Sequence, residues 1–129
     1  MDPRAQRALT MGKASTKSTG NWGEQLATKT LEQQGFDIVE MNYRFGRGEI
    51  DIIARDGDVL VFCEVKTRKN DEYGEPEYAI TPRKQQQIKR IAEGYLYEHE
   101  IKEQECRFDV VAIRMHGATP EIRYWKNAF

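Results

Sequence analysis

The sequence lacks the features that mark several classes of protein. Its 129 residues include two cysteines, Cys63 and Cys106, and no CxxC or Cys/His cluster. A structural zinc site or a disulfide framework is therefore not expected. No apolar run approaches the roughly 20 residues that span a bilayer, and no apolar signal-peptide segment follows Met1. These absences predict a cytoplasmic protein with reduced thiols and no membrane segment.

An excess of charge of one sign is also missing. Lysine and arginine number 20, aspartate and glutamate 21, and the net charge is −1. Any binding of nucleic acid must therefore use local basic patches. The length predicts one domain, over residues 20–129. The preceding residues 1–19 carry four basic side chains and one acidic one with little to bury, which predicts a mobile basic arm.

The spacing of apolar residues and of turn signals predicts an α/β fold. Asn21 and Gly35 bracket a first helix, and Thr81-Pro82 opens a second. A mixed central sheet flanked by helices accommodates this order. The predicted elements are a helix over 21–34, strands over 36–43, 48–54 and 59–66, a loop over 69–77, a helix from 82 to about 99, and strands over 107–115 and 121–125.

Charged residues interrupt the hairpin formed by the second and third predicted strands. The third strand is strongly apolar up to Glu64-Val65-Lys66, and Asp51 lies in the second strand. Glu64 and Lys66 share a face because strand side chains alternate. Charges that emerge from a core need a partner or a metal ion. One reading is a carboxylate site for Mg²⁺ or Mn²⁺, with Glu49 as a spare ligand; the other is a set of salt bridges at the sheet edge.

Two further acidic residues stand out. Glu24 lies on the same helical face as Ala27 and Leu31, so it could close the carboxylate site from the first helix. The alternative is that it is only a favourable acid in the first helical turn. Asp109 is unusual for a strand and is expected to pair with a base such as Arg107 or Arg68.

Several segments together resemble known nucleases. Asp51 followed across a hairpin by Glu64-Val65-Lys66 resembles the PD-(D/E)xK nuclease superfamily, which has an αβββαβ core. The sequences around Glu24, Asp51, Glu64 and Asp109 resemble the YraN-like bacterial family, which is similar to archaeal Holliday-junction resolvases. The resemblance implies a restriction-endonuclease-like fold over about residues 20–126. Ile50 departs from the superfamily pattern, which has proline there.

The resemblance also implies a site and a substrate. It places Glu24, Asp51, Glu64 and Lys66 at catalytic positions, with the three acids holding Mg²⁺ or Mn²⁺. The expected partner is branched or structured DNA, cut by phosphodiester hydrolysis without an organic cofactor. A junction has two-fold symmetry, so a homodimer is expected. The alternative is a DNA- or protein-binding module of the same fold without turnover.

Local cations near the predicted site are candidates for contacts with DNA phosphates, because no basic field covers the whole chain. They are found in the loop after the first strand, at the end of the third strand and at the start of the second helix. These residues are Arg44, Arg47, Arg68 and Lys84.

Overall fold

The computed structural model of the protein describes residues 19–68 and 80–129. The predicted arm over 1–19, apart from Thr19, and the predicted loop over 69–77 lie outside these residues. The elements are α2 (Thr19–Gln33), β1 (Asp37–Phe45), β2 (Gly48–Asp56), β3 (Val59–Arg68), α3 (Pro82–Glu98), β4 (Cys106–His116) and β5 (Thr119–Trp125). Their order and type confirm the prediction, and their ends differ from it by at most two residues. Neither described helix is long and apolar enough to cross a membrane.

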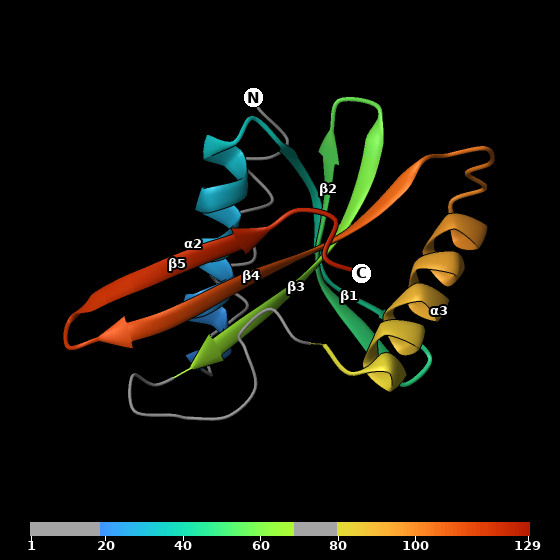
Figure 1. Ribbon diagram of the computed structural model, residues 1–129. Helices are drawn as coiled ribbons and strands as arrows, with labels where there is room; N and C mark the ends of the chain where they lie inside the picture. The colour runs from blue at the N-terminus through green and yellow to red at the C-terminus, as the bar shows by residue number, and fades with distance from the viewer. Residues whose placement is uncertain (1–18, 69–79) are drawn as a thin grey trace.

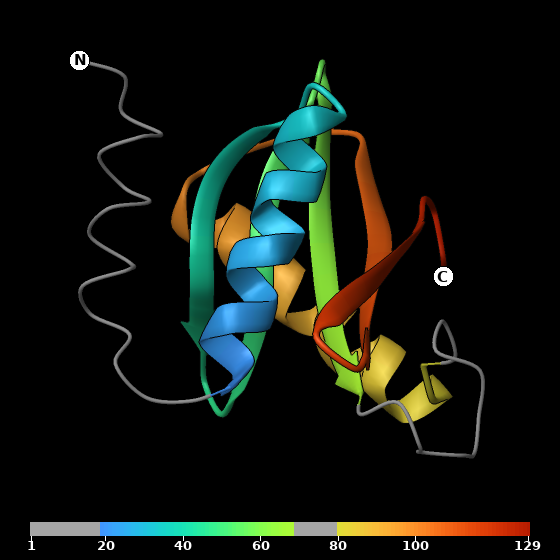
Figure 2. The same ribbon diagram turned by 90° about the vertical axis from the view of Figure 1, so that its left-hand side faces the viewer.

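The five strands form one mixed sheet in the order β1-β2-β3-β4-β5. β1, β2 and β3 are joined as antiparallel hairpins, and β4 and β5 form a third antiparallel pair. β3 and β4 are parallel, because α3 carries the chain back between them. Helix α2 covers one face of the sheet and α3 the other (Figures 1 and 2). The result is an α/β fold consistent with a restriction-endonuclease-like core.

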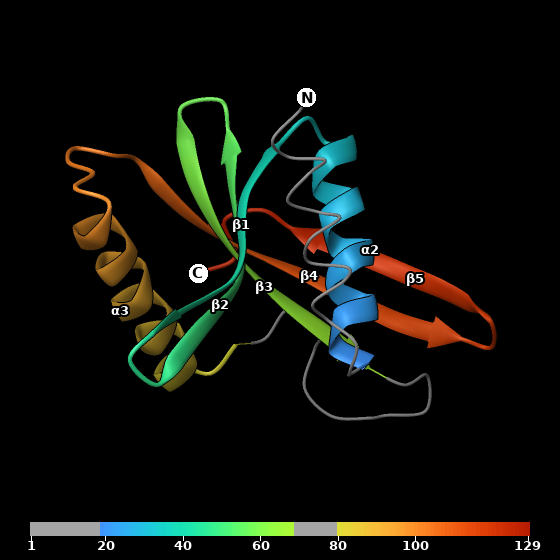
Figure 3. The same cartoon turned by 180° about the vertical axis from the view of Figure 1, so that it is seen from behind.

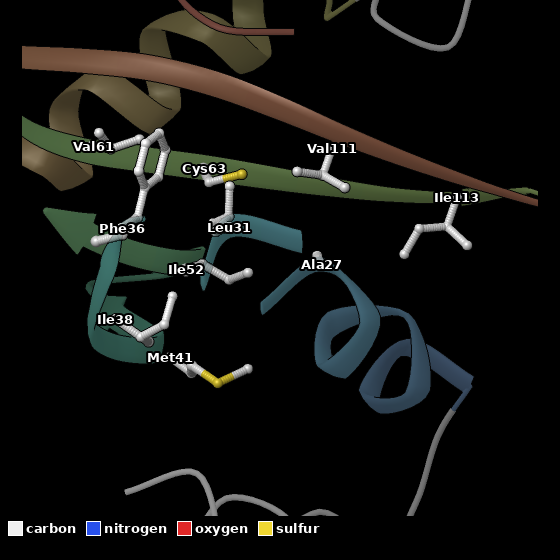
Figure 4. Close-up of a cluster of buried hydrophobic side chains, with 11 residues drawn as sticks. Ala27, Leu31, Phe36, Ile38, Met41, Ile52, Val61, Cys63, Val111 and Ile113 are labelled. Atoms are coloured by element: carbon white, nitrogen blue, oxygen red, sulfur yellow. The ribbon is translucent and has the colours of Figure 1, made fainter. Parts of the chain in front are cut away.

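Each helix closes its own hydrophobic core. On the α2 side, Ala27 and Leu31 are fully buried against strand residues that include Ile52 and Val111 (Figure 4). On the α3 side, Phe62 and Tyr95 lie edge to face, with 6.0 Å between ring centroids. The sheet is therefore apolar on both faces where the helices cover it, which explains the continuous apolar run of β3.

Two of the predicted helix ends are confirmed by their hydrogen bonds, whereas the predicted start at Asn21 is wrong because α2 begins at Thr19 and Asn21 lies within its first turn. The Thr81 hydroxyl accepts from the Lys84 backbone N–H at 3.2 Å and caps the start of α3. At the end of α2, the Phe36 N–H donates to the Leu31 carbonyl at 3.0 Å, and the Gly35 N–H donates to the Glu32 carbonyl at 2.9 Å. This pair of bonds is the Schellman ending that the sequence predicts.

The β1–β2 hairpin changes faces partway along its length. Residues two apart in a strand normally share a face. Yet Met41 and Ile52 belong to the core under α2, whereas Tyr43 and Ile50 belong to the core under α3. The change falls at Asn42, whose φ of 55° is left-handed, and at the facing stretch of β2. The tip of the hairpin is therefore turned toward α3.

Two glycines let the turned hairpin tip approach α3 closely. A Cβ atom on Gly94 of α3 would lie 2.6 Å from the ring of Phe45, and one on Gly48 of β2 would lie 2.3 Å from Ile91 Cδ1. Neither contact leaves room for a side chain. The hairpin tip is thus fixed against the helix, away from the end of β3.

Asp109 of β4 is a fully buried acid, and it pairs in register with Cys63 of β3. Its carboxylate accepts from Arg107 Nε and Nη2, each at 3.0 Å, from the Tyr124 hydroxyl, and from the Asn127 backbone N–H at 2.8 Å. Arg107 also pairs with Asp56 at 2.8 Å. The predicted pairing of Asp109 with Arg107 is confirmed, and it joins β4 to β5 and to the segment after β5.

Replacing Asp109 tests this network. Asp109→Ala leaves Arg107 and the Tyr124 hydroxyl without their buried acceptor, so the free energy of unfolding should fall by about 3–5 kcal/mol in urea denaturation. Glu93→Ala, on the exposed surface of α3, should change it by less than about 0.5 kcal/mol. A loss below about 1 kcal/mol for Asp109→Ala would show that the network contributes little to stability.

Candidate functional site

The ladder between β2 and β3 ends at the pair Ile52 and Cys63, although both strands continue. Beyond that pair, β2 stays bonded to β1 as far as Gly48, and β3 stays bonded to β4 as far as Arg68. The two strands therefore diverge, as Figures 1 and 3 show for the β1–β2 hairpin and the end of β3. We call the region between the diverging strands the fork.

Asp51 is the first residue of β2 inside the fork. Its Oδ2 accepts the backbone N–H of Val65 at 2.8 Å. That N–H lies on β3 just past the end of the ladder, so the carboxylate takes the place of a ladder acceptor. Asp51 is thereby fixed between the two strands rather than on one face of the sheet.

Three carboxylates meet at the fork. Single oxygens of Glu24, Glu49 and Asp51 all lie within 4.8 Å of one another. Glu24 comes from the first half of α2, and the other two come from β2 on either side of Ile50. All three are partly buried. Glu49, predicted as a spare ligand, belongs to this close group.

Glu64 meets the group from β3. It is close enough to Asp51 for the two carboxyls to share a proton, and its Oε2 lies 3.8 Å from the Lys84 ammonium of α3. Lys66, two residues further along β3, is close enough to lower the pKa of Glu64. Glu64 lies outside the close group of three oxygens and reaches it through Asp51. We refer to Glu24, Glu49, Asp51 and Glu64 together as the acidic cluster.

Proximity and burial raise the pKa values within the acidic cluster. Desolvation and the charge of Asp51 raise the pKa of Glu24 to about 7, against a hydrogen bond from Asn42 that lowers it. Desolvation and the Asp51 charge raise the pKa of Glu64 to about 8, although Lys84 opposes the rise. The pKa of Asp51 is also raised, chiefly by desolvation. Near neutral pH, the cluster therefore retains protons that exposed carboxylates would release.

The chemistry of this cluster suits a hard divalent cation. Its donors are carboxylate oxygens, which Mg²⁺ and Mn²⁺ favour over sulfur or imidazole ligands. A divalent ion would also neutralise the like charges that hold the pKa values high. The alternative of salt bridges at the sheet edge is partly met among the described residues. Lys84 pairs with Glu64 and Arg44 with Glu49, while Glu24 and Asp51 face other acids.

The predicted phosphate-binding cations occupy different sides of the fork. Arg44 and Arg47 lie at the tip of the β1–β2 hairpin; both are exposed, and Arg44 is 4.0 Å from Glu49. Arg68 ends β3 on the opposite side and is partly buried. Lys84 is turned inward to Glu64. The structure thus places three of the four around the fork and one inside it.

Sequence reasoning assigned no role to Asn42. A single asparagine in a predicted strand carries no clear signal, since the left-handed conformation and the contact with Glu24 depend on the packing of α2 against β1. The close grouping of Glu49 with Glu24 was equally hidden. Ordinary alternation puts Glu49 and Asp51 on one face, but it gives no distance to the helix.

Comparison with known proteins gives a consistent family. The family model described as "Uncharacterised protein family UPF0102" matches residues 23–113. A UPF0102 protein of Syntrophus aciditrophicus is 48% identical over 111 residues, which cover 86% of this chain and 87% of that protein. One of Geotalea daltonii is 48% identical over 119 residues, covering 92% and 94%. One of Dictyoglomus turgidum is 41% identical over 117 residues, covering 89% and 99%.

The raised pKa of Glu64 predicts how stability depends on pH when metal is removed by a chelator. Folding raises the pKa of Glu64 from 4.5 to about 8. The folded protein therefore binds this proton more tightly than the unfolded chain, which favours folding fully below pH 4.5. The contribution is lost as the pH rises to about 8. Glu64→Gln cannot ionise, so its stability relative to wild type should increase by roughly 1–3 kcal/mol between pH 5 and 8.

Urea denaturation at several pH values measures this difference. Glu93→Gln, on the exposed surface of α3, should follow wild type throughout the range. A constant difference between Glu64→Gln and wild type would mean that Glu64 ionises like an exposed acid.

Proposed function

The chain belongs to the uncharacterised protein family UPF0102, and from the geometry of the fork we propose that it is a divalent-metal-dependent endonuclease of branched or structured DNA. The observation that carries the proposal is the meeting of carboxylates from α2, β2 and β3 where β2 and β3 part, with lysines beside them. A merely solvated acidic face would not raise the pKa of its members by burial.

The roles of the residues follow from their placement. Glu24, Asp51 and Glu64 would hold Mg²⁺ or Mn²⁺, and Glu49 is close enough to take part. When bound, such an ion polarises the phosphate and lowers the pKa of water. Asp51 keeps its orientation through the Val65 N–H. The positive charge of a bound ion would also offset the repulsion among these carboxylates, so they would remain ionised at neutral pH.

Lys66 would act on the phosphate. It lies on β3 two residues after Glu64 and on the same side of the strand, and its charge is near enough to lower the pKa of Glu64. Negative charge grows on the phosphate oxygens as hydrolysis proceeds. A fixed cation beside them stabilises the transition state more than the bound substrate.

The surroundings of the fork support DNA as the substrate. Exposed Arg44 and Arg47 on one side and Arg68 on the other can neutralise phosphates of strands that enter the fork. Lys84 lies 3.8 Å from Glu64 and could move from it to a phosphate. DNA strands that diverge at a junction would follow β2 and β3, which diverge on the two sides of the fork. A homodimer would match the two-fold symmetry of a junction.

A cleavage assay tests the proposal directly. Purified protein is incubated with junctions, flaps, single strands and duplexes in Mg²⁺ or Mn²⁺, beside Asp51→Asn prepared identically. Wild type should cut a branched substrate, and Asp51→Asn should not, because it loses the negative charge of a ligand, although its amide oxygen can still accept from the Val65 N–H. Mn²⁺ at about 100 times its dissociation constant should stabilise wild type by about 2.7 kcal/mol and leave Asp51→Asn unchanged. DNA binding without cleavage would instead identify a binding module.

Lys66→Ala separates chemistry from binding. Metal and DNA affinities should change little, whereas the single-turnover cleavage rate should fall by about 10²–10³, because Lys66 acts on charge that develops during the reaction. Lys89→Ala, on α3 over Phe108, is the matched control and should retain the wild-type rate. Equal rates in wild type and Lys66→Ala would point to a contaminating nuclease and remove the support for catalysis.

A further inference from the structure

Asn42 has an unusual backbone conformation in the middle of β1. Its φ of 55° lies in the left-handed region, which asparagine tolerates better than other residues with a side chain, apart from aspartate. β1 is paired with β2 on both sides of it, through Met41 with Ile52 and through Tyr43 with Ile50. The conformation is therefore enforced within a continuous ladder rather than at a frayed end.

The place of Asn42 on the ladder coincides with the origin of the fork. Asp51 is the residue of β2 between Ile50 and Ile52, so it faces the Asn42 position. At these two residues the hairpin changes from the core under α2 to the core under α3. The side chain of Asn42 is close enough to Glu24 on α2 for its amide to lower the pKa of that carboxyl. One residue thus joins the turn of the hairpin to the carboxylate that α2 contributes.

We infer that Asn42 is a positioning residue, which holds the Glu24 carboxylate toward Asp51 through its side-chain amide while its backbone turns the hairpin. This inference rests on the proposed divalent-metal site. Glu24 stands beside the charges of Asp51 and Glu49, which would drive its side chain out toward water. An amide that donates to the ionised carboxylate opposes that movement and keeps the oxygen available as a ligand.

The two contributions of Asn42 can be separated by substitution. Glycine adopts the left-handed conformation without penalty but has no amide. Asn42→Gly should therefore keep a melting temperature close to that of wild type, while its Mn²⁺ dissociation constant, measured by calorimetry at 25 °C, rises about 10–100-fold. Asn42→Ala should show the same loss of affinity and also a lower melting temperature, because alanine is strained in this conformation.

Asn127 provides a matched control. It is a second left-handed asparagine, with φ of 57°, and its backbone N–H donates to Asp109 of β4 rather than to a member of the acidic cluster. Asn127→Gly should keep the wild-type affinity for Mn²⁺, and Asn127→Ala should lower the melting temperature without changing that affinity. A general effect of removing such asparagines would appear in both pairs of variants.

A double-mutant cycle identifies the partner of Asn42. On a Glu24→Gln background, Asn42→Gly should cause little further loss of Mn²⁺ affinity, because the carboxylate that it positions is gone. If Asn42→Gly binds Mn²⁺ with wild-type affinity, the inference is overturned and the proposed function is unaffected. The same holds if Asn42→Gly does not fold. Absence of Mn²⁺ binding by wild type would overturn the proposed function and this inference together.

Discussion

The parting of β2 from β3 after Ile52 and Cys63 is the constraint on which the acidic cluster depends. In a continuous sheet, side chains from the α2 face and the α3 face are separated by the backbone. At the fork that separation ends, so Glu24 from α2 and Lys84 from α3 can both act on Asp51. Diverging strands also leave backbone groups without ladder partners, and Asp51 accepts one of them from Val65.

Packing at some distance from the cluster keeps the fork open. Phe45 lies against Gly94 and Gly48 against Ile91, so the hairpin tip is fixed on α3. The core under α2 fixes the first half of the hairpin in the same way. Each half of the hairpin therefore belongs to a different core, and the fork is stabilised by hydrophobic burial on both sides of the sheet. The like-charge repulsion within the cluster is tolerated because the surrounding structure is held independently.

Buried charge is used in two different ways in this fold. Asp109 is surrounded by donors from Arg107, Tyr124 and the Asn127 backbone, so its charge is matched within the protein. Glu24 and Asp51 instead face other carboxylates, and their pKa values are raised. Satisfied networks of the first kind stabilise a fold, whereas unmatched acids of the second kind are candidates for a functional site.

The sequence by itself determined the order and type of the elements, because apolar periodicity, caps and turn residues are local properties of the chain. It also singled out Asp51 and Glu64, since charges within apolar strands are visible without a structure, whereas Glu24 was assigned to the site through the family resemblance. Only the tertiary structure decided that Glu49 joins Glu24 and Asp51, that Lys84 pairs with Glu64, and that Asn42 contacts Glu24. Those relations depend on a left-handed residue within a strand and on a divergence of strands. Both arise from packing between distant segments, which no local pattern records.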